Sequence, residues 1–506
     1  MRNPVIFREV ASTQIARAEG GAATIESSAV AGASRRPRLI FLAIFAAAAV
    51  IYCLHLGADA LGASEAYSAW AAAKDVGAIV RTPVLHDPGK QVFYYLVLHS
   101  YAQVFGLSEI SLRSLSVIFS LTTLLLVFAI GCEMFDDNTA LAAAAVWAFN
   151  PLAVAFAHTA RMYPMLIAVA LAYLLTLWRV RQRPSAGRAV LCGVVGAALL
   201  YTHLGGILFV GAGVAMLARD YLHGRRKQDA MAWLALAITL VLFVPYVPVA
   251  HAQSQTLVAG HWLDWIGPGH EYPPVLKIAF SIVTAAVALW FVFGTNVSAR
   301  NDQLVWLGAW TFLPGLILAA ASIVIRPMFN LRYVAPSTAA LAILFAAGAA
   351  HASVKWRNLL AAGFPLACLI LLPFDQTKSQ PWREIAAQVA SGSASDPVFF
   401  ESGFVSTGAN AGSNAPNDGF PFGYYLIPFN YYYRGDNPRI PVPGYDPASA
   451  RTMIENRVSA AGGGWLVSWK DRDAVTSELP DSQRFSVIEK LQGDHLEFYR
   501  IAPAAK

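Results

Sequence analysis

The run SLRSLSVIFSLTTLLLVFAIG, from Ser111 to Gly131, decides the fold of this chain. After Arg113 the run contains no charged residue, and about 20 apolar residues are enough to cross a bilayer as a helix. Similar runs recur as far as Phe374, and the sequence therefore predicts an α-helical, polytopic membrane protein. About eleven candidate spans begin near Leu39, Ser111, Ala140, Tyr163, Ala189, Gly205, Met231, Val275, Leu304, Val334 and Leu359.

The composition of the whole chain agrees with this interpretation. Of 506 residues, 56% are hydrophobic and only 13% are charged, with a mean hydropathy of +0.48. Soluble domains carry roughly a quarter charged residues, so an ordinary soluble enzyme is excluded. The net charge of +6 is unevenly divided, because residues 375–506 hold 12 basic and 15 acidic residues while the rest is basic. This division indicates a membrane part with basic loops and a separate acidic domain, and it argues against a nucleic-acid partner.

Three regions follow from these patterns. Residues 1–38 are polar and precede the first span, so they are expected to form a disordered cytoplasmic tail, and residues 39–374 form the transmembrane part. Cytoplasmic loops retain Lys and Arg, and one set of alternate loops collects most of them. The opposite loops are poor in basic residues and are expected to face the periplasm of a bacterial inner membrane. An odd number of spans places residues 375–506 on that side too.

Residues 375–506 are expected to form a periplasmic α/β domain. Two segments have helical periodicity, and four short apolar segments are typical of strands. No cysteine lies in this region, so no disulfide framework is expected there. The helical segments are Trp382–Val389 and Ala448–Val458, and the strand segments are Pro397–Phe400, Trp465–Trp469, Phe485–Ile488 and Leu496–Tyr499.

An ordered set of motifs resembles a known family. The stretch GKQVFYYLVLHSYAQVFGLSEISLRSLS, residues 89–116, comes first, followed in order by ARMYPML at 160–166, YTH at 201–203, PYVP at 245–248, RPMFNLRYVAP at 326–336 and PWREIA at 381–386. Together they are similar to the bacterial family 39-type glycosyltransferases of the GT-C fold, which are related to protein O-mannosyltransferases and lipid A aminoarabinose transferases. The resemblance covers nearly the whole chain from Leu39.

The resemblance implies a function. It implies a membrane glycosyltransferase that moves a sugar from a polyprenyl-phosphate-linked donor to an acceptor hydroxyl on the outer membrane face, by single displacement with inversion. The acceptor is a lipid, a glycan or a protein, and membrane lipids surround the enzyme. Two alternatives stay open: a lipid or sugar transporter or flippase, and a catalytically inactive GT-C relative. The spans show little of the repeats and midspan Gly/Pro breaks that a transporter predicts.

Catalysis is expected in the first outside loop, residues 58–91. Attack by a hydroxyl on an anomeric carbon needs a base, and a carboxylate is a usual choice. Relatives open this loop with Asp-Glu-Ala-Tyr, where this chain has Ser64, Glu65, Ala66 and Tyr67, so Ser64 replaces the first acid. Glu65 is the first candidate base, and the other candidates are Asp87 and Asp59. A solvated charge at a helix start explains Glu65 without any chemistry.

The donor phosphate is expected to meet cations at the membrane edge, where a cation is worth more than in water. Arg161 in ARMYP and Arg332 in NLRY are isolated beside spans on the outside, and Lys90 is the third candidate. Arginine also suits two-pronged phosphate binding. The alternative role for all three is snorkelling to lipid headgroups.

Aromatic and histidine side chains complete the expected site. Tyr95 and His99 share a helical face at a spacing of four residues, and with Tyr67 and His203 they are candidates to line a polar substrate cavity. A structural histidine is an equal alternative at both histidine positions. No metal ligand set is assigned, since the histidines between residues 251 and 270 match no zinc spacing. No cofactor is indicated, although a divalent metal stays open. Glu109 and Arg113, four apart, are expected to pair at the start of a span.

Overall fold

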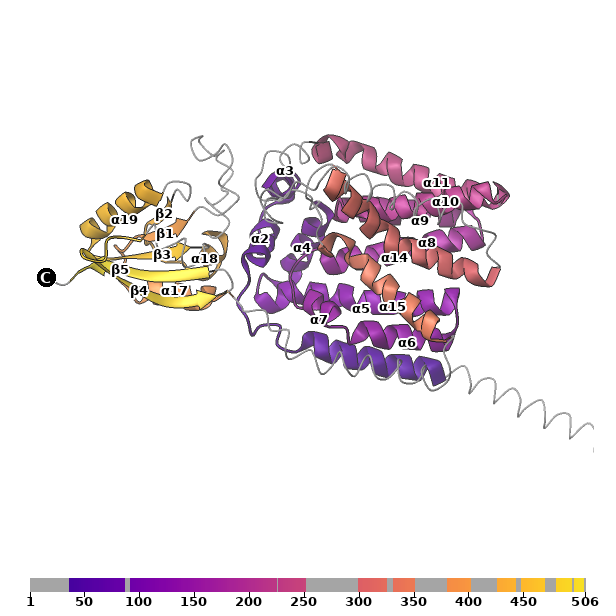
Figure 1. Cartoon of the computed structure of the whole chain (residues 1–506), viewed down its shortest axis with the longest axis horizontal. Helices are drawn as coiled ribbons and strands as arrows, with labels where there is room; N and C mark the ends of the chain where they lie inside the picture. Colours follow the sequence, from indigo (N-terminus) through magenta and orange to yellow (C-terminus); the bar gives the residue numbers. More distant parts are fainter. Residues whose placement is uncertain are drawn as a thin grey trace, which may run out of the picture.

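The computed structural model has a helical bundle and a C-terminal sheet domain, drawn side by side in Figure 1. The structure describes residues 36–86, 92–224, 226–251, 299–324, 331–350, 380–401, 426–442, 447–468, 479–493 and 496–504. The candidate base Asp87 and the candidate phosphate-binding residue Lys90 lie outside these ranges. The candidate spans that begin near Val275 and Leu359 also lie outside them. The other nine candidate span starts fall on or beside described helices.

The helices of the bundle follow one another with short connections. The first described helix is Arg36–Cys53. The next helices are α2 (Ala63–Ala72), α3 (Val76–His86), α4 (Val92–Phe105), α5 (Glu109–Met134), α6 (Asp137–Ala148), α7 (Pro151–Ala157) and α8 (Tyr163–Gln182). They are followed by α9 (Ala186–Thr202), α10 (Gly206–Leu222), α11 (Arg226–Phe243), η1 (Val244–Tyr246), α14 (Ala299–Val324), η3 (Leu331–Val334) and α15 (Ala335–Ala350).

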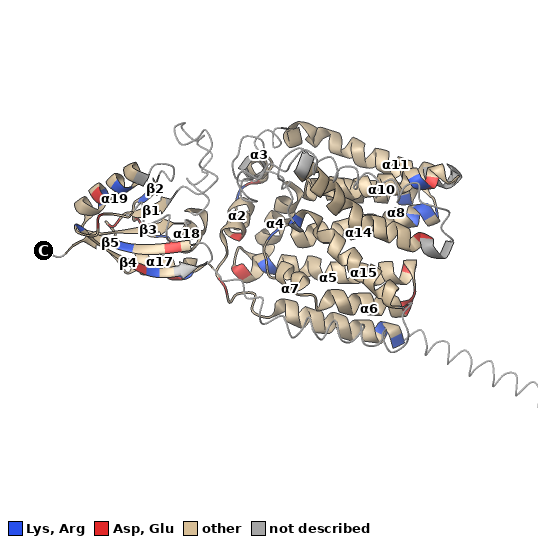
Figure 2. Cartoon of the chain, viewed as in Figure 1, with Lys and Arg blue, Asp and Glu red and all other residues tan. Residues whose placement is uncertain are grey.

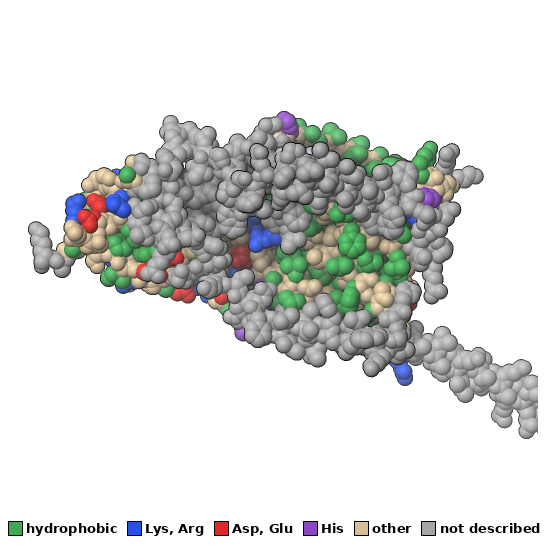
Figure 3. Space-filling view, in the orientation of Figure 1, with side chains coloured by type: hydrophobic (Ala, Val, Ile, Leu, Met, Phe, Trp, Pro, Cys, Tyr) green, Lys and Arg blue, Asp and Glu red, His purple; other side chains and the backbone are tan. Residues whose placement is uncertain are grey.

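Length and composition qualify six of the described helices as membrane spans. A bent pair, α6 and α7, makes a seventh if it is one span, with a bend of 62°. α9 and α10, with 17 residues each, fall just short of the length required for this group. Where the described helices are visible in Figure 3, hydrophobic side chains dominate the surface of the bundle. The chain is thus a multi-pass membrane protein.

Small residues let the helices of the bundle approach closely. A Cβ atom added to Gly131 in α5 would lie 2.6 Å from the Cα atom of Ala140 in α6. Backbone atoms cannot move aside as a flexible side chain can, so only glycine fits at this crossing. Such small-residue contacts are typical of helix packing in membranes, where there is no hydrophobic effect to hold helices together.

The C-terminal domain has a mixed five-stranded sheet in the order β2-β1-β3-β5-β4. β1 is parallel to both of its neighbours, and β5 is antiparallel to both of its own. The strands are β1 (Val398–Glu401), β2 (Arg439–Val442), β3 (Gly464–Ser468), β4 (Phe485–Gly493) and β5 (Leu496–Pro503).

Helices cover both faces of this sheet, as Figure 1 shows. Alternate residues of a strand point to opposite faces, and in β1 Phe400 packs with α17 (Trp382–Ala390) and α18 (Leu426–Tyr432) while Phe399 packs with α19 (Pro447–Ala461). The expected α/β domain is confirmed, including all four expected strands and both expected helices. β2 and α18 were not expected from the sequence.

Charged residues mark the two ends of the bundle. Figure 2 shows Lys and Arg gathered around the ends of α8 and α10, at the end of the bundle farthest from the sheet domain. The opposite end carries α2 and α3 and meets the sheet domain (Figure 1). The site expected from the sequence lies at this second end, because α2 carries Ser64 and Glu65 in its first turn.

Candidate functional site

Glu65 occupies the first turn of α2, where its carboxylate is buried. Its Oε2 atom accepts a hydrogen bond from the backbone N–H of Gly62 at 3.1 Å, as a side chain at the third helical position does in a capping box. Its Oε1 atom accepts from the backbone N–H of Ala160 at 2.8 Å. Arg113 donates to both oxygens at 2.9 Å. A carboxylate has about four acceptor positions, so those of Glu65 are all occupied.

The Arg113 guanidinium, from α5, is equally saturated. Besides the two bonds to Glu65, its Nη1 atom donates to the carbonyl oxygens of Leu56 at 2.8 Å and Asp59 at 2.9 Å, and its Nη2 atom donates to that of Ala60 at 3.2 Å. These five bonds use all five donors of the group. Arg113 therefore fixes the path of the chain from the first helix into α2.

The expected pairing of Glu109 with Arg113 is wrong. The spacing of four residues allows that pair on one helix, but the Arg113 donors are all directed to Glu65 and to the loop before α2. The Glu109 carboxylate binds the guanidinium of Arg383 in α17 instead, with Nε donating to Oε1 at 3.0 Å. A partner from a distant part of the chain has replaced the local one.

This contact docks the sheet domain on the bundle. Arg383 also donates to the carbonyl oxygens of Gly57 and Ala58, both at 2.9 Å, and of Asp59 at 3.2 Å. Glu109 provides the charge that offsets the guanidinium. Arg113 and Arg383 therefore hold the same loop from the bundle side and from the sheet-domain side.

Tyrosines of α18 extend the docking contact. The Tyr432 hydroxyl accepts from the backbone N–H of Leu61 at 2.6 Å and donates to Glu109. The Tyr431 hydroxyl donates to the carbonyl oxygen of Leu107 at 2.6 Å. Burial raises the pKa of Tyr431 to about 12, and burial together with the hydrogen bond to Glu109 also raises the pKa of Tyr432. Both hydroxyls therefore keep their protons and donate at neutral pH.

Arg161 lies behind α2, where only 3% of its surface is exposed. Its Nη1 atom donates to the carbonyl oxygen of Ser64 at 2.7 Å and to the Ser68 hydroxyl at 3.3 Å. Ser64, which replaces the expected acid, is therefore bound by Arg161, which was expected to bind the donor phosphate. The guanidinium is close to the expected catalytic loop, on its inner side.

Arg332 is exposed on η3 and lies over the ring of Tyr163, with 5.9 Å between the guanidinium carbon and the ring centroid. The His203 ring is 6.3 Å from Tyr163 and 5.0 Å from Tyr333, so these aromatic residues form a platform beside Arg332. Tyr163 begins α8 two residues after Arg161, so the aromatic cluster that Arg332 contacts continues from the segment of chain that carries Arg161. Of these two expected cations, Arg161 is buried and Arg332 is exposed.

Close packing of the chain positions this platform. His203 is buried, and its Nδ1 atom accepts from the backbone N–H of Gly205 at 2.8 Å, which leaves Nε2 as the protonated nitrogen of the neutral ring. A Cβ atom on Gly205 would lie 2.9 Å from that Nδ1 atom and 3.1 Å from the carbonyl oxygen of Tyr333. Gly205 therefore allows η3 to lie against the corner between α9 and α10.

The remaining expected cavity residues have packing partners. Tyr67 and Tyr95 are almost fully buried, with ring centroids 6.0 Å apart, and they join α2 to α4. His99 is half-buried, and its Nδ1 atom lies 2.9 Å from the carbonyl oxygen of Ala72 at the end of α2. These contacts support α2 from α4. Asp59 has an exposed side chain, while its carbonyl oxygen is held by Arg113 and Arg383 as described above.

The sequence did not indicate a second buried charge cluster, at the other end of the bundle. Arg181 in α8 donates to Asp220 in α10 and, at 2.6 Å, to Asp302 in α14, and Arg219 donates to Asp302 at 3.0 Å. The sequence feature that could have indicated this cluster is the pair of acids, Asp220 and Asp302, among loops that are otherwise basic. Within the described residues no group of three His, Cys, Asp or Glu side chains is arranged to hold a metal ion.

Comparison with known proteins identifies the fold. Residues 90–248 match the family model of dolichyl-phosphate-mannose-protein mannosyltransferases. The structure of ArnT from Cupriavidus metallidurans in the apo state is similar with a TM-score of 0.54 and 15% identity, over 91% of this chain and 97% of that one. The chain is a multi-pass membrane protein with the GT-C fold, and part of it is similar to the dolichyl-phosphate-mannose-protein mannosyltransferases. The resemblance inferred from the motifs is confirmed.

A second structure of ArnT from Cupriavidus metallidurans, bound to undecaprenyl phosphate, matches this GT-C protein with a TM-score of 0.52 and 14% identity, over the same shares of the two chains. No curated protein matches the chain at a significant level. The family-model match includes Arg113, Arg161 and His203, whereas Glu65 and Arg332 lie outside it. The roles of those two residues therefore depend on the geometry of this chain.

Proposed function

We propose that this GT-C protein transfers a sugar from a polyprenyl-phosphate-linked donor to an acceptor hydroxyl on the periplasmic face of a bacterial inner membrane. The observation that carries the proposal is that Arg332 lies over the ring of Tyr163, which begins α8 two residues after Arg161, at the end of the bundle that bears α2. ArnT, which shares the fold, has been solved with undecaprenyl phosphate. Cations and an aromatic surface suit such a phosphate and the sugar attached to it.

The two arginines have different roles in this proposal. At about 4 Å a cation stabilises a phosphate by about 1 kcal/mol in water and by about 4 kcal/mol in a medium of intermediate polarity. Arg332 is exposed, so it receives the donor phosphate as it approaches from the membrane. Arg161 is buried and bound to Ser64, so it adds positive potential from behind and keeps α2 in place.

The reaction requires one proton to move. The acceptor oxygen attacks the anomeric carbon, the bond from that carbon to the phosphate oxygen breaks, and polyprenyl phosphate leaves as the acceptor proton passes to a base. Glu65 was the first candidate base, but its four acceptor positions are occupied, so we infer that it positions the loop. The exposed Asp59 is then the candidate base among the described residues, and Asp87, outside them, is the other candidate.

Orientation follows from the distribution of charge. Lys and Arg gather at the end of the bundle farthest from the sheet domain (Figure 2), and cytoplasmic loops are the ones that retain them. This supports a periplasmic position for α2, Arg332 and the sheet domain. The acceptor, whether lipid, glycan or protein, then meets the donor outside the cytoplasm.

The experiment that tests the proposal measures sugar release from a panel of polyprenyl-phosphate sugars by the purified full-length protein in detergent. General-base catalysis contributes about a hundred-fold or more to rate, so Asp59→Asn or Asp87→Asn should lower turnover at least that much while donor binding stays intact. Glu384→Gln, an exposed change on α17, is the matched control and should leave turnover unchanged. Full activity in both aspartate variants would contradict the assignment of the base.

Ser64 favours a second candidate function, which is donor binding without transfer. It stands where relatives have an acid, and the neighbouring carboxylate of Glu65 is already occupied. In that case the wild type binds the donor and releases no sugar, while Ser64→Asp restores an acid at the start of α2 and gains turnover. Turnover by the wild type would exclude this second function. Absence of both binding and turnover would contradict both functions.

A further inference from the structure

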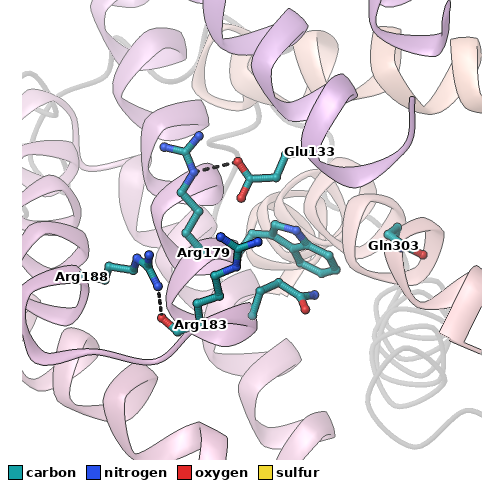
Figure 4. A pocket seen from close by; sticks show the side chains of 7 residues that line it. Glu133, Arg179, Arg183, Arg188 and Gln303 are labelled. Carbon is teal, nitrogen blue, oxygen red and sulfur yellow. Dashed lines mark hydrogen bonds and ion pairs between the residues drawn. The ribbon is translucent and has the colours of Figure 1, made fainter. Parts of the chain in front are cut away.

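A basic pocket lies at the end of the bundle farthest from the candidate site. It has a volume of about 590 Å³ and lies where α5 and α8 end and where α9 and α14 begin. Figure 4 shows Arg179, Arg183 and Arg188 entering it from one side and Gln303 standing on the other. The lining residues are Glu133, Trp178, Arg179, Gln182, Arg183, Arg188 and Gln303.

Positive charge exceeds negative charge in this pocket. Arg179 pairs with Glu133 at 2.7 Å, and Arg188 donates to the carbonyl oxygen of Arg183 at 2.5 Å (Figure 4). Within the described part of the chain, the Arg183 guanidinium has neither an ion pair nor a hydrogen bond. Three arginines against one carboxylate leave a surplus of positive charge, and the unoccupied donors of Arg183 can receive an anion.

The buried charge cluster beneath the pocket holds its walls in place without neutralising it. Arg181 and Arg219 pair with Asp220 and Asp302, and these two cations and two anions cancel. The cluster joins α8, α10 and α14. Trp178, which lines the pocket, lies against Arg181 with 4.9 Å between the guanidinium carbon and the ring centroid. The arginines at the pocket therefore project from a fixed scaffold, and their surplus charge is directed outward.

The surface beside the pocket suits lipid. Val190, Leu191 and Val194 follow Arg188 along α9, and each is about half exposed, with 49%, 55% and 48% of its surface accessible. On a helix of a membrane bundle such side chains face acyl chains. A ligand here thus meets positive charge at one end and an apolar helix surface at the other. The N–H donors of a planar arginine guanidinium match the geometry of phosphate oxygens.

We propose that this pocket binds the phosphate-bearing headgroup of an anionic membrane lipid, with Arg183 as the main contact and the acyl chains along α9. Basic pockets between membrane helices are suited to such headgroups. The ligand is distinct from the polyprenyl-phosphate donor, whose expected site lies at the other end of the bundle. The inference therefore does not depend on the proposed glycosyltransferase activity.

The test uses native mass spectrometry of the full-length protein in detergent with equimolar phosphatidylglycerol and phosphatidylcholine. We expect the wild type to retain phosphatidylglycerol in preference. One basic side chain near a membrane surface contributes about a five-fold preference for an anionic lipid, so Arg183→Gln should lower retention about five-fold. The Arg183 side chain has no ion pair or hydrogen bond among the described residues, so the variant should fold, and equal melting temperatures for variant and wild type check this. Arg457→Gln, which removes an exposed arginine of the sheet domain, is the control and should match the wild type.

Four outcomes would overturn the proposal. Equal retention of the two lipids by the wild type would show that the pocket does not select an anionic headgroup. Unchanged retention in Arg183→Gln, or an equal loss in Arg457→Gln, would show that selection arises elsewhere. Complete displacement of phosphatidylglycerol by added inorganic phosphate would assign the pocket to a soluble phosphate instead of a lipid. If neither inorganic phosphate nor phosphatidylcholine displaces the bound phosphatidylglycerol, the result supports an anionic lipid headgroup as the ligand.

Discussion

Glu65 in α2 and Arg113 in α5, 48 residues apart, form a buried ion pair in which both carboxylate oxygens accept from the guanidinium at 2.9 Å. Every donor of Arg113 and every acceptor position of Glu65 is used. The pair therefore fixes α2 relative to the bundle. Glu65 is the candidate base that the sequence favours most, yet all acceptor positions of its carboxylate are occupied by hydrogen bonds within the protein.

Glu65→Gln should destabilise the protein before it affects any chemistry. Removing one partner of a buried ion pair costs about 3–5 kcal/mol, because the other charge stays buried without compensation. We therefore expect a lower melting temperature for Glu65→Gln and no change for the exposed Glu384→Gln, measured by thermal unfolding in detergent. A variant with the wild-type melting temperature and no turnover would make Glu65 the base after all.

Tyr432→Phe should loosen the loop between the first helix and α2. The Tyr432 hydroxyl accepts from the Leu61 amide at 2.6 Å, and a hydrogen bond contributes about 1 kcal/mol, or about five-fold in a local opening equilibrium. Hydrogen exchange at the Leu61 amide should therefore speed up about five-fold.

Tyr431→Phe is the matched control for that change, since it removes the neighbouring hydroxyl, which bonds to Leu107 and not to Leu61. Its exchange rate at Leu61 should equal that of the wild type. If both variants speed exchange equally, the effect comes from general loosening of α18 and not from the Tyr432 hydrogen bond.

The sequence predicted those parts of the fold that depend on local patterns. The apolar run from Ser111 and the strand-like segment from Leu496 have their periodicity within one element, and both elements formed as expected. α18 was missed because its sequence, LIPFNYY, has neither clear helical periodicity nor a cap signal. β2 was missed because Pro441 argues against a strand, although its position at the sheet edge tolerates proline.

For the charged residues of the candidate site, the sequence predicted their positions better than their interaction partners. Arg161 and Arg332 were chosen as isolated cations beside spans; Arg332 lies over the Tyr163 ring, while Arg161 is buried and bound to Ser64 and Ser68. Glu109 was paired with Arg113 because charges four residues apart are neighbours on one helix. The actual partners, Glu65 and Arg383, come from other elements, and only the tertiary packing brings them together.

Asp302→Asn should destabilise the basic end of the bundle. Asp302 accepts from Arg181 at 2.6 Å and from Arg219 at 3.0 Å, and all three side chains are buried. The loss of the acid leaves two buried cations facing one remaining carboxylate, at a cost of about 3–5 kcal/mol. The melting temperature should fall, whereas the exposed Asp436→Asn should leave it unchanged. Equal melting temperatures for the two variants would show that the cluster does not hold these helices.

Arg332→Gln should weaken donor binding without unfolding the protein. Arg332 is exposed on η3, so its attraction for the donor phosphate is close to the value in water, about 1 kcal/mol, or about five-fold in affinity. We expect KM for the polyprenyl-phosphate sugar to rise about five-fold, and Arg332→Lys to restore most of the loss because it keeps the charge. Arg161→Gln, by contrast, should lower the melting temperature, since its buried guanidinium holds Ser64 and Ser68. The control Arg457→Gln should alter neither quantity. An unchanged KM in Arg332→Gln, or a melting temperature lowered as far as in Arg161→Gln, would remove Arg332 from the donor site and leave the phosphate to other groups.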